Sequence, residues 1–279
     1  MSRLFDRVAS VKISGGGQSR EITGLRVSFQ VRKTRSSTPN TCDVVIYNPN
    51  DQTRKTALDN EAEIEVFAGY AGNATLISRA QIQRAIPVRT PPDITLEIEA
   101  QEGLRDLREK TVNISHEANS QVSSVLDELT GILGYDVRPI DFDISQRLRG
   151  GFAHVGKLSR ALDDLVTRFG GYWSVQNGEV LVLPEKGFVD GTEIPVISAQ
   201  TGMINSPEPV EEQTSSEKLS TEPRRGYKVR SLLIPTIEPG DRFELRALDA
   251  SGIYAVDEVE HRGDTRGAEW YSIVTGYET

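Results

Sequence analysis

The sequence has little of the material that stabilises secreted or membrane proteins. Its 279 residues include one cysteine, Cys42, which rules out an internal disulfide framework and agrees with a reducing compartment. No stretch approaches the roughly 20 apolar residues that span a bilayer. Residues 1–6 (MSRLFD) lack the apolar core of a secretory signal. We therefore expect synthesis in a host cytoplasm and no membrane insertion.

Basic charge is also scarce. Asp and Glu outnumber Lys and Arg by 41 to 32, so the net charge is −9 with neutral histidines, and the cations are scattered among acids. A protein that grips DNA usually carries a basic stripe, because phosphate neutralisation supplies most non-specific affinity. Two interpretations remain: an acidic surface that keeps the protein soluble, or a surface past which a polyanion moves without sticking.

Residue patterns typical of enzymes and metal sites are missing as well. His116, His154 and His261 are far apart, and none has a second ligand at metal spacing. Residues 15–17 (GGG) lack a following Gly-Lys-Ser/Thr and a following helix pattern, which favours a hairpin turn over a phosphate cradle. We predict no catalytic residue, cofactor or metal ligand, although the many carboxylates leave a glycosidase pair open on count alone.

What the first hundred residues do contain is alternation. Apolar side chains occupy every second position in four runs, within residues 26–32, 41–47, 61–68 and 93–100. Such period-two patterning buries one face of a strand and leaves the other wet. Turn-forming residues separate the runs, and a short helical turn is plausible at 51–58. The pattern predicts a small barrel or sandwich.

The middle of the chain changes period. Residues 122–133 and 158–169 each place apolar side chains on one helical face, and glycines follow both, at Gly134 and at Gly170-Gly171. Asn177-Gly178, between two apolar runs, is a strong hairpin signal. These features predict an α+β insert.

The last third returns to alternating strands, interrupted at 205–226 by an acidic, proline-containing stretch that we interpret as a long loop. The fold class expected is mainly β with an α+β insert. The predicted boundaries are a β-barrel at 1–102, the insert at 103–189, and a second β-barrel with the acidic loop at 190–279.

Short phrases at both ends of the chain resemble one family. Residues 40–49 (NTCDVVIYNP) followed by 66–70 (VFAGY) resemble the opening domain of phage baseplate hub proteins. Residues 226–235 (GYKVRSLLIP), 238–240 (EPG), 252–256 (GIYAV) and 261–265 (HRGDT) resemble the closing domain of the same family. Each phrase is weak alone, but their order matches over the full length. Cys42 stands where the family often has Ala, which suits a small inward-facing side chain.

The resemblance implies a structural protein of a contractile phage tail. Hub proteins of this tail-tube-like family look like a tube subunit duplicated within one chain, so a homotrimer forms a pseudo-sixfold ring. The implied partners are the tail-tube ring above, a trimeric spike below and neighbouring baseplate proteins, with phage DNA passing through the channel without specific binding. The implied location is the virion.

Two sets of residues are candidates for the channel wall. One set is Glu61, Glu63 and Glu65, whose plain interpretation is a solvated face; the other is Arg26, Gln30 and Arg32 on the opposite strand. The loop at 33–40, with Lys33, Arg35 and Asn40, is a candidate for docking to a neighbouring ring. Its plain interpretation, a solvated hairpin loop, is equally open.

Two alternatives remain open. One is a virion-associated cell-wall hydrolase, most plausibly a carboxylate-dependent glycosidase. The other is the equivalent hub of a bacterial contractile injection system, which would share the fold and mechanics.

Overall fold

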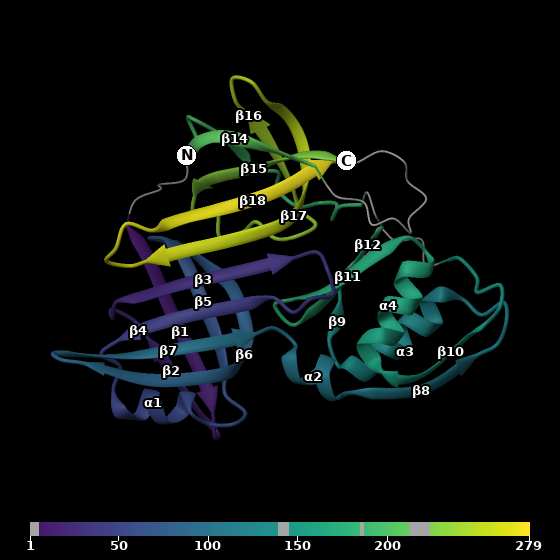
Figure 1. Ribbon diagram of the computed structural model, residues 1–279, viewed down its shortest axis with the longest axis horizontal. Helices are drawn as coiled ribbons and strands as arrows, with labels where there is room; N and C mark the ends of the chain where they lie inside the picture. Colours follow the sequence, from purple (N-terminus) through teal and green to yellow (C-terminus); the bar gives the residue numbers. More distant parts are fainter. Residues whose placement is uncertain (1–5, 139–144, 185–186, 212–223) are drawn as a thin grey trace.

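The computed structural model describes residues 6–138, 145–184, 187–211 and 224–279. Most of these residues are in antiparallel strands, and a smaller helical part lies in the middle of the chain, so the predicted mainly β class is confirmed. Figure 1 shows strands from the first and last thirds side by side, with α3 and α4 of the middle third beside them.

Residues 7–101 form seven strands and a short helix. The elements are β1 (Arg7–Gly15), β2 (Gln18–Ile22), β3 (Val27–Thr34), β4 (Thr41–Tyr47), α1 (Asp51–Ala57), β5 (Glu63–Tyr70), β6 (Asn73–Thr90) and β7 (Asp93–Gln101). The four alternating runs become β3, β4, β5 and β7, and their inward side chains build one apolar core. Asn50 caps α1 by accepting a 2.8 Å hydrogen bond from the Thr53 amide.

The middle third forms a separate core around two helices. Its elements are α2 (Leu104–Glu109), β8 (Thr111–His116), α3 (Val122–Leu133), β9 (Asp136–Val137), β10 (Phe152–Lys157), α4 (Leu158–Arg168), β11 (Gly171–Gln176) and β12 (Glu179–Pro184). The two predicted helices are confirmed as α3 and α4, and Gly134 ends α3 in the left-handed conformation. Asn177 and Gly178 both have positive φ and join β11 to β12, as the hairpin signal predicts.

The last third contributes six strands and a third core. They are β13 (Val196–Ser198), β14 (Met203–Glu211), β15 (Arg225–Leu232), β16 (Arg242–Arg246), β17 (Ser251–Asp264) and β18 (Trp270–Glu278). The loop predicted at 205–226 is wrong at both ends, because 205–211 belong to β14 and 225–226 to β15. Pairing with β15 orders this edge strand despite its weak apolar pattern. Residues 212–223 of the expected loop lie outside the described residues.

The two β regions are joined directly. β17 pairs with β3 along the register from Glu258↔Thr34 to Asp264↔Ser28, which makes one 13-stranded sheet where the sequence suggested two separate ones. We call this β3–β17 pairing the internal seam. Phe29 and Trp270 make an edge-to-face contact across it, with ring centroids 5.7 Å apart. Two cores thus share one continuous sheet.

The order of strands in this sheet repeats. One half runs β14-β15-β18-β17 and the next runs β3-β4-β7-β6, so each half places its first, second, fourth and third strands side by side. In each half a further strand pairs with the third one, β16 with β17 and β5 with β6. The third strand also carries one extra residue at a bulge in both halves, Asp257 in β17 and Gln83 in β6. The same arrangement therefore occurs twice in one polypeptide.

Candidate functional surface

The outward face of the eight repeated strands is densely charged. The register places one alternating set of side chains on this face, which we call the charged face. Its cations include Arg32, Arg84, Lys228, Arg230 and Arg262, and its anions are Asp43, Asp93, Glu97, Glu99, Glu208, Glu258, Glu260 and Asp264. The face therefore carries both signs, with more anions than cations.

Two ion pairs on this face cross neighbouring strands. Arg32 of β3 binds Glu258 of β17 through two hydrogen bonds of 2.7 and 3.0 Å, so this bidentate pair crosses the seam. These hydrogen bonds raise the pKa of Arg32 above its ordinary value. Arg84 pairs with Glu99 at 3.4 Å. Arg262 is also paired, with Glu260 of its own strand, so three of the five named cations already bind a carboxylate.

The predicted channel residues of β3 lie on this face. Gln30 and Arg32 point outward from the strand, between Asp43 and Thr41 on one side and β17 on the other. Arg26, just before β3, binds Asp264 at 2.7 Å and stacks on the ring of Tyr47 at 4.4 Å. All three residues are accessible or partly accessible at the seam.

The glutamates lie elsewhere. Glu63 and Glu65 belong to β5, which is separated from β3 by β4, β7 and β6, and Glu61 precedes the strand. Glu65 is held between Lys12 at 3.0 Å and Arg79 at 2.9 Å. The expected row of like charges is therefore partly neutralised. Which set faces a channel stays a prediction.

The three docking-loop candidates need correction. Lys33, Arg35 and Asn40 are buried, not presented to a neighbour. Arg35 pairs with Asp257 at 3.1 Å and lies over the ring of Tyr172. The exposed residues of this loop are Ser36 and Thr38. Ser36 and Thr38, at the tip of the loop, are therefore its residues that a neighbouring ring could contact.

Lys33 and Asn40 belong to a buried cluster that we call the polar junction, because all three regions of the chain contribute to it. Its members are Lys33, Asn40, Glu102, Arg138, Gln176, Asn177 and Glu238. The Lys33 ammonium lies 3.2 Å from Glu238 and 3.8 Å from Glu102. Asn40 donates to Glu102 at 3.0 Å and to the Val175 carbonyl at 2.9 Å.

Electrostatics in the polar junction differ between its two carboxylates. Burial raises the pKa of Glu102, although Lys33, Asn40 and the Asn177 amide oppose that effect. Burial also acts on Glu238, but Lys33 and Arg138 lower its pKa overall. Glu238 also accepts a 2.6 Å hydrogen bond from the side-chain amide nitrogen of Asn177. The junction joins the insert to both β regions, and within it the side-chain oxygen of Asn177 is buried without a hydrogen-bond partner.

Sequence reasoning missed the polar junction, but a signal for Lys33 was present. In β3 the buried positions are Val27, Phe29 and Val31, so position 33 continues the inward phase of the same strand. Extending the alternation by one residue would have placed the lysine inside. No comparable pattern marks Arg138 or Glu238.

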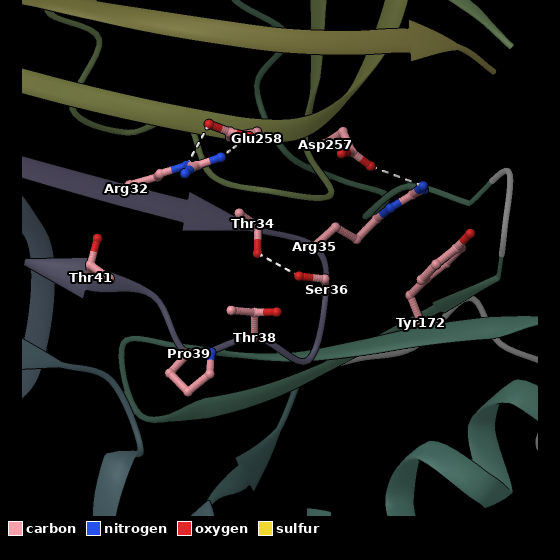
Figure 2. A pocket seen from close by; sticks show the side chains of 10 residues that line it. All are labelled: Arg32, Thr34, Arg35, Ser36, Thr38, Pro39, Thr41, Tyr172, Asp257 and Glu258. Atoms are coloured by element: carbon pink, nitrogen blue, oxygen red, sulfur yellow. Dashed lines mark hydrogen bonds and ion pairs between the residues drawn. The ribbon is translucent and has the colours of Figure 1, made fainter. Parts of the chain in front are cut away.

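A shallow crevice opens beside the β3–β4 loop (Figure 2). Figure 2 shows Arg32 and Arg35 turned toward Glu258 and Asp257, with Tyr172 of the insert on the far side. Its volume is about 460 Å³. Because both arginines are already paired with carboxylates, the crevice offers no free cation to an anionic ligand.

Within the described ranges, no group of three or more His, Cys, Asp or Glu side chains is arranged to hold a metal ion. In the same part of the chain, none of the helices has the length and apolar character needed to cross a bilayer.

Comparison with known proteins finds the fold but no sequence family. No family model matches, and no curated protein sequence matches. A tail protein from Neisseria meningitidis MC58 covers 98% of this chain and 97% of its own, with a TM-score of 0.69 at 9% identity. The 43 kDa tail protein of prophage MuSo2 from Shewanella oneidensis covers 96% and 98%, with a TM-score of 0.66 at 8% identity.

A third similar structure comes from a secretion machine. It is the Escherichia coli c3393 protein, a component of the type VI secretion system that exhibits structural similarity to the T4 bacteriophage tail proteins gp27 and gp5. The match covers 96% of this chain and 77% of that one, with a TM-score of 0.63 at 13% identity. The chain therefore has the fold of these tail and secretion proteins along nearly its whole length.

Proposed function

We propose that three copies of this chain form the baseplate hub of a contractile phage tail, a pseudo-sixfold ring that adapts a sixfold tube to a trimeric spike. The observation that carries the proposal is the repeated strand order of the sheet. Two equivalent units in one chain allow a threefold assembly to present six similar units to a tube. The full-length similarity to phage tail proteins supports the same role.

Ring closure requires complementary edges, and two of the free edges of the sheet correspond to the two strands of the internal seam. Within the chain, the third strand of one unit (β17) pairs with the first strand of the other (β3). The remaining first strand, β14, and the second half of β6 each have a partner on one side only. Pairing β14 of one chain with β6 of the next repeats the internal seam head to tail, which closes a ring when the rotation allows it.

The repeat also gives the register of this proposed seam. Val88 follows the β6 bulge residue Gln83 by five positions, as Arg262 follows Asp257 in β17. Glu208 of β14 occupies the place of Gln30 in β3. Because Gln30 opposes Arg262 within the chain, Glu208 of one copy is expected opposite Val88 of the next.

The charged face would then line the channel. A wall with paired charges of both signs releases few counterions to passing DNA, so the genome is not held by it. The tube ring would contact one end of the hub and the spike the other, with other baseplate proteins around the rim. In this role the chain is a structural virion component without catalytic activity.

Cysteine cross-linking tests the proposal. Directly opposite residues of antiparallel strands have Cα atoms about 4.5–5.5 Å apart, within disulfide range. At high protein concentration the double variant V88C/E208C should therefore give a covalent trimer on oxidation, seen on a denaturing gel, because each disulfide traps even a short-lived pairing of the two edges. The native Cys42 does not interfere, because burial raises the pKa of its thiol to about 12.

The matched control is V88C/E211C, which moves one cysteine three residues along β14 and out of register. Cross-linked trimers from V88C/E208C alone support the ring. Monomers from both variants, with native folding, would contradict it.

A second candidate is the hub of a bacterial contractile injection system, favoured by the similarity to the type VI secretion component and to a chain of a Francisella PdpA-VgrG complex. Ring formation is expected for both candidates, so binding to a purified phage tube or to a secretion-system tube distinguishes them. A cell-wall hydrolase is tested by a peptidoglycan zymogram, in which a lysis band would overturn the structural role.

A further inference from the structure

The two free edges that the proposed ring would join carry prolines. Pro87 lies in the second half of β6, and Pro207 and Pro209 lie in β14, with Pro207 inside the bulge between Ile204 and Glu208. Proline has no backbone N–H, so within sheets it is tolerated at an edge whose N–H side faces away from a partner. Such residues blunt an edge against pairing with another chain.

The internal seam shows which residues exchange hydrogen bonds. The Arg35 amide, at the end of β3, donates to the Asp257 carbonyl at 2.9 Å. Because donors alternate along a strand, the amides of Lys33 and Val31 also face β17, and Val31 lies opposite His261. Position 31 of β3 and position 261 of β17 therefore form a hydrogen-bonded pair.

The repeat maps this pair onto two prolines. Pro209 follows Glu208 as Val31 follows Gln30, and Pro87 precedes Val88 as His261 precedes Arg262. In the seam between chains, Pro209 thus faces Pro87 at a position that calls for two N–H donors. Neither residue can supply one.

We propose that this proline pair weakens the seam between chains, so that the free chain pairs only briefly and a lasting ring forms when a tube ring or spike holds the copies together. The inference rests on the proposed function, since it concerns the same seam. The seam within the chain, with Val31 and His261, keeps its full ladder and holds the two units together permanently. The seam between chains lacks two hydrogen bonds at its centre, so it is weak in the free chain and lasting only when a tube ring or spike holds the copies together.

The double variant P87T/P209T restores both donors at exposed positions. Two hydrogen bonds of about 1 kcal/mol each correspond to roughly 30-fold tighter pairing per seam. Sedimentation velocity over a concentration series should show the wild type as a monomer and P87T/P209T as a trimer at the same micromolar concentration. P39T, the same substitution in the β3–β4 loop, is the matched control and should stay monomeric.

The outcomes distinguish failure of the proline inference from failure of the proposed ring. A wild-type trimer that persists at nanomolar concentration overturns the proline inference and leaves the ring intact. A monomeric P87T/P209T, with a circular dichroism spectrum like that of the wild type, also overturns the inference if V88C/E208C still cross-links into trimers. If V88C/E208C fails to cross-link as well, the proposed function fails with it.

Discussion

The ammonium group of Lys33 lies 3.2 Å from a carboxylate oxygen of Glu238 and 3.8 Å from one of Glu102, in a site where the lysine side chain is 1% exposed. A lysine from β3, a glutamate that follows β7 and another that precedes β16 thus meet in the protein interior. The Arg138 side chain of the insert binds the same Glu238. Lys33 therefore binds carboxylates of both β regions, and it is connected to the insert through the Glu238 that Arg138 also binds.

Replacing Lys33 by Met should strongly destabilise the protein. Without its cation, buried Glu102 is an uncompensated charge, and breaking a buried pair costs about 3–5 kcal/mol. We expect a loss of this size in the free energy of unfolding, measured by urea denaturation. The double variant K33M/E102Q should recover part of it, because the glutamine carries no charge.

Arg84→Met is the control for Lys33→Met. The Arg84–Glu99 pair is solvent-exposed, and such pairs contribute about 0–1 kcal/mol. Equal losses for K33M and R84M would mean that the polar junction has no special role in stability.

The buried His261 predicts sensitivity to acid. Its Nδ1 lies 2.8 Å from the Ser272 hydroxyl, and burial together with nearby Lys33 lowers its pKa to about 3. In the unfolded chain the imidazole is protonated as pH falls below about 6.5, whereas in the folded chain it stays neutral until about pH 3. The stability that neutral His261 contributes is therefore present above pH 6.5 and is lost as pH falls toward 3.

His261→Gln removes that titration. The wild type should lose stability between pH 6.5 and pH 5 more steeply than H261Q, as measured by urea denaturation at each pH. Parallel curves for the two proteins would show that His261 does not govern this range.

Gly263 should be intolerant of a side chain. It lies on β17 in the internal seam, where a Cβ would collide with the Phe29 ring and approach Trp270 to 3.0 Å. Overpacking of this kind costs about 1–3 kcal/mol, so Gly263→Ala should lower the melting temperature. Gly131→Ala, in α3 with open space around it, should leave the melting temperature unchanged or raise it. The reverse order would contradict the packing of the seam.

Patterns within a few neighbouring residues were enough to predict several of the strands, the two longer helices and one hairpin. Alternation located β3, β4 and β7, helical periodicity located α3 and α4, and Asn177-Gly178 located a hairpin. The long strand β6 was missed because it bends at Gln83 and carries Pro87, and both features interrupt simple alternation. The outlying strand β14 was mistaken for loop because Pro207 and Pro209 mimic loop composition.

Long-range pairing could not be predicted in this way. The β3–β17 seam joins residues about 230 positions apart, and the repeat of strand order has no matching repeat of residues. The docking loop was misjudged because Lys33 and Arg35 look exposed by type, whereas carboxylates from distant segments satisfy them inside. Burial of charge depends on partners that a local window does not contain.

The most direct test of the hub assembly is electron microscopy of oxidised V88C/E208C, averaged by class. The repeated units predict rings of three chains with a central hole and a nearly sixfold outline in end view. Open chains, dimers or rings of another number of copies would contradict the proposed threefold ring.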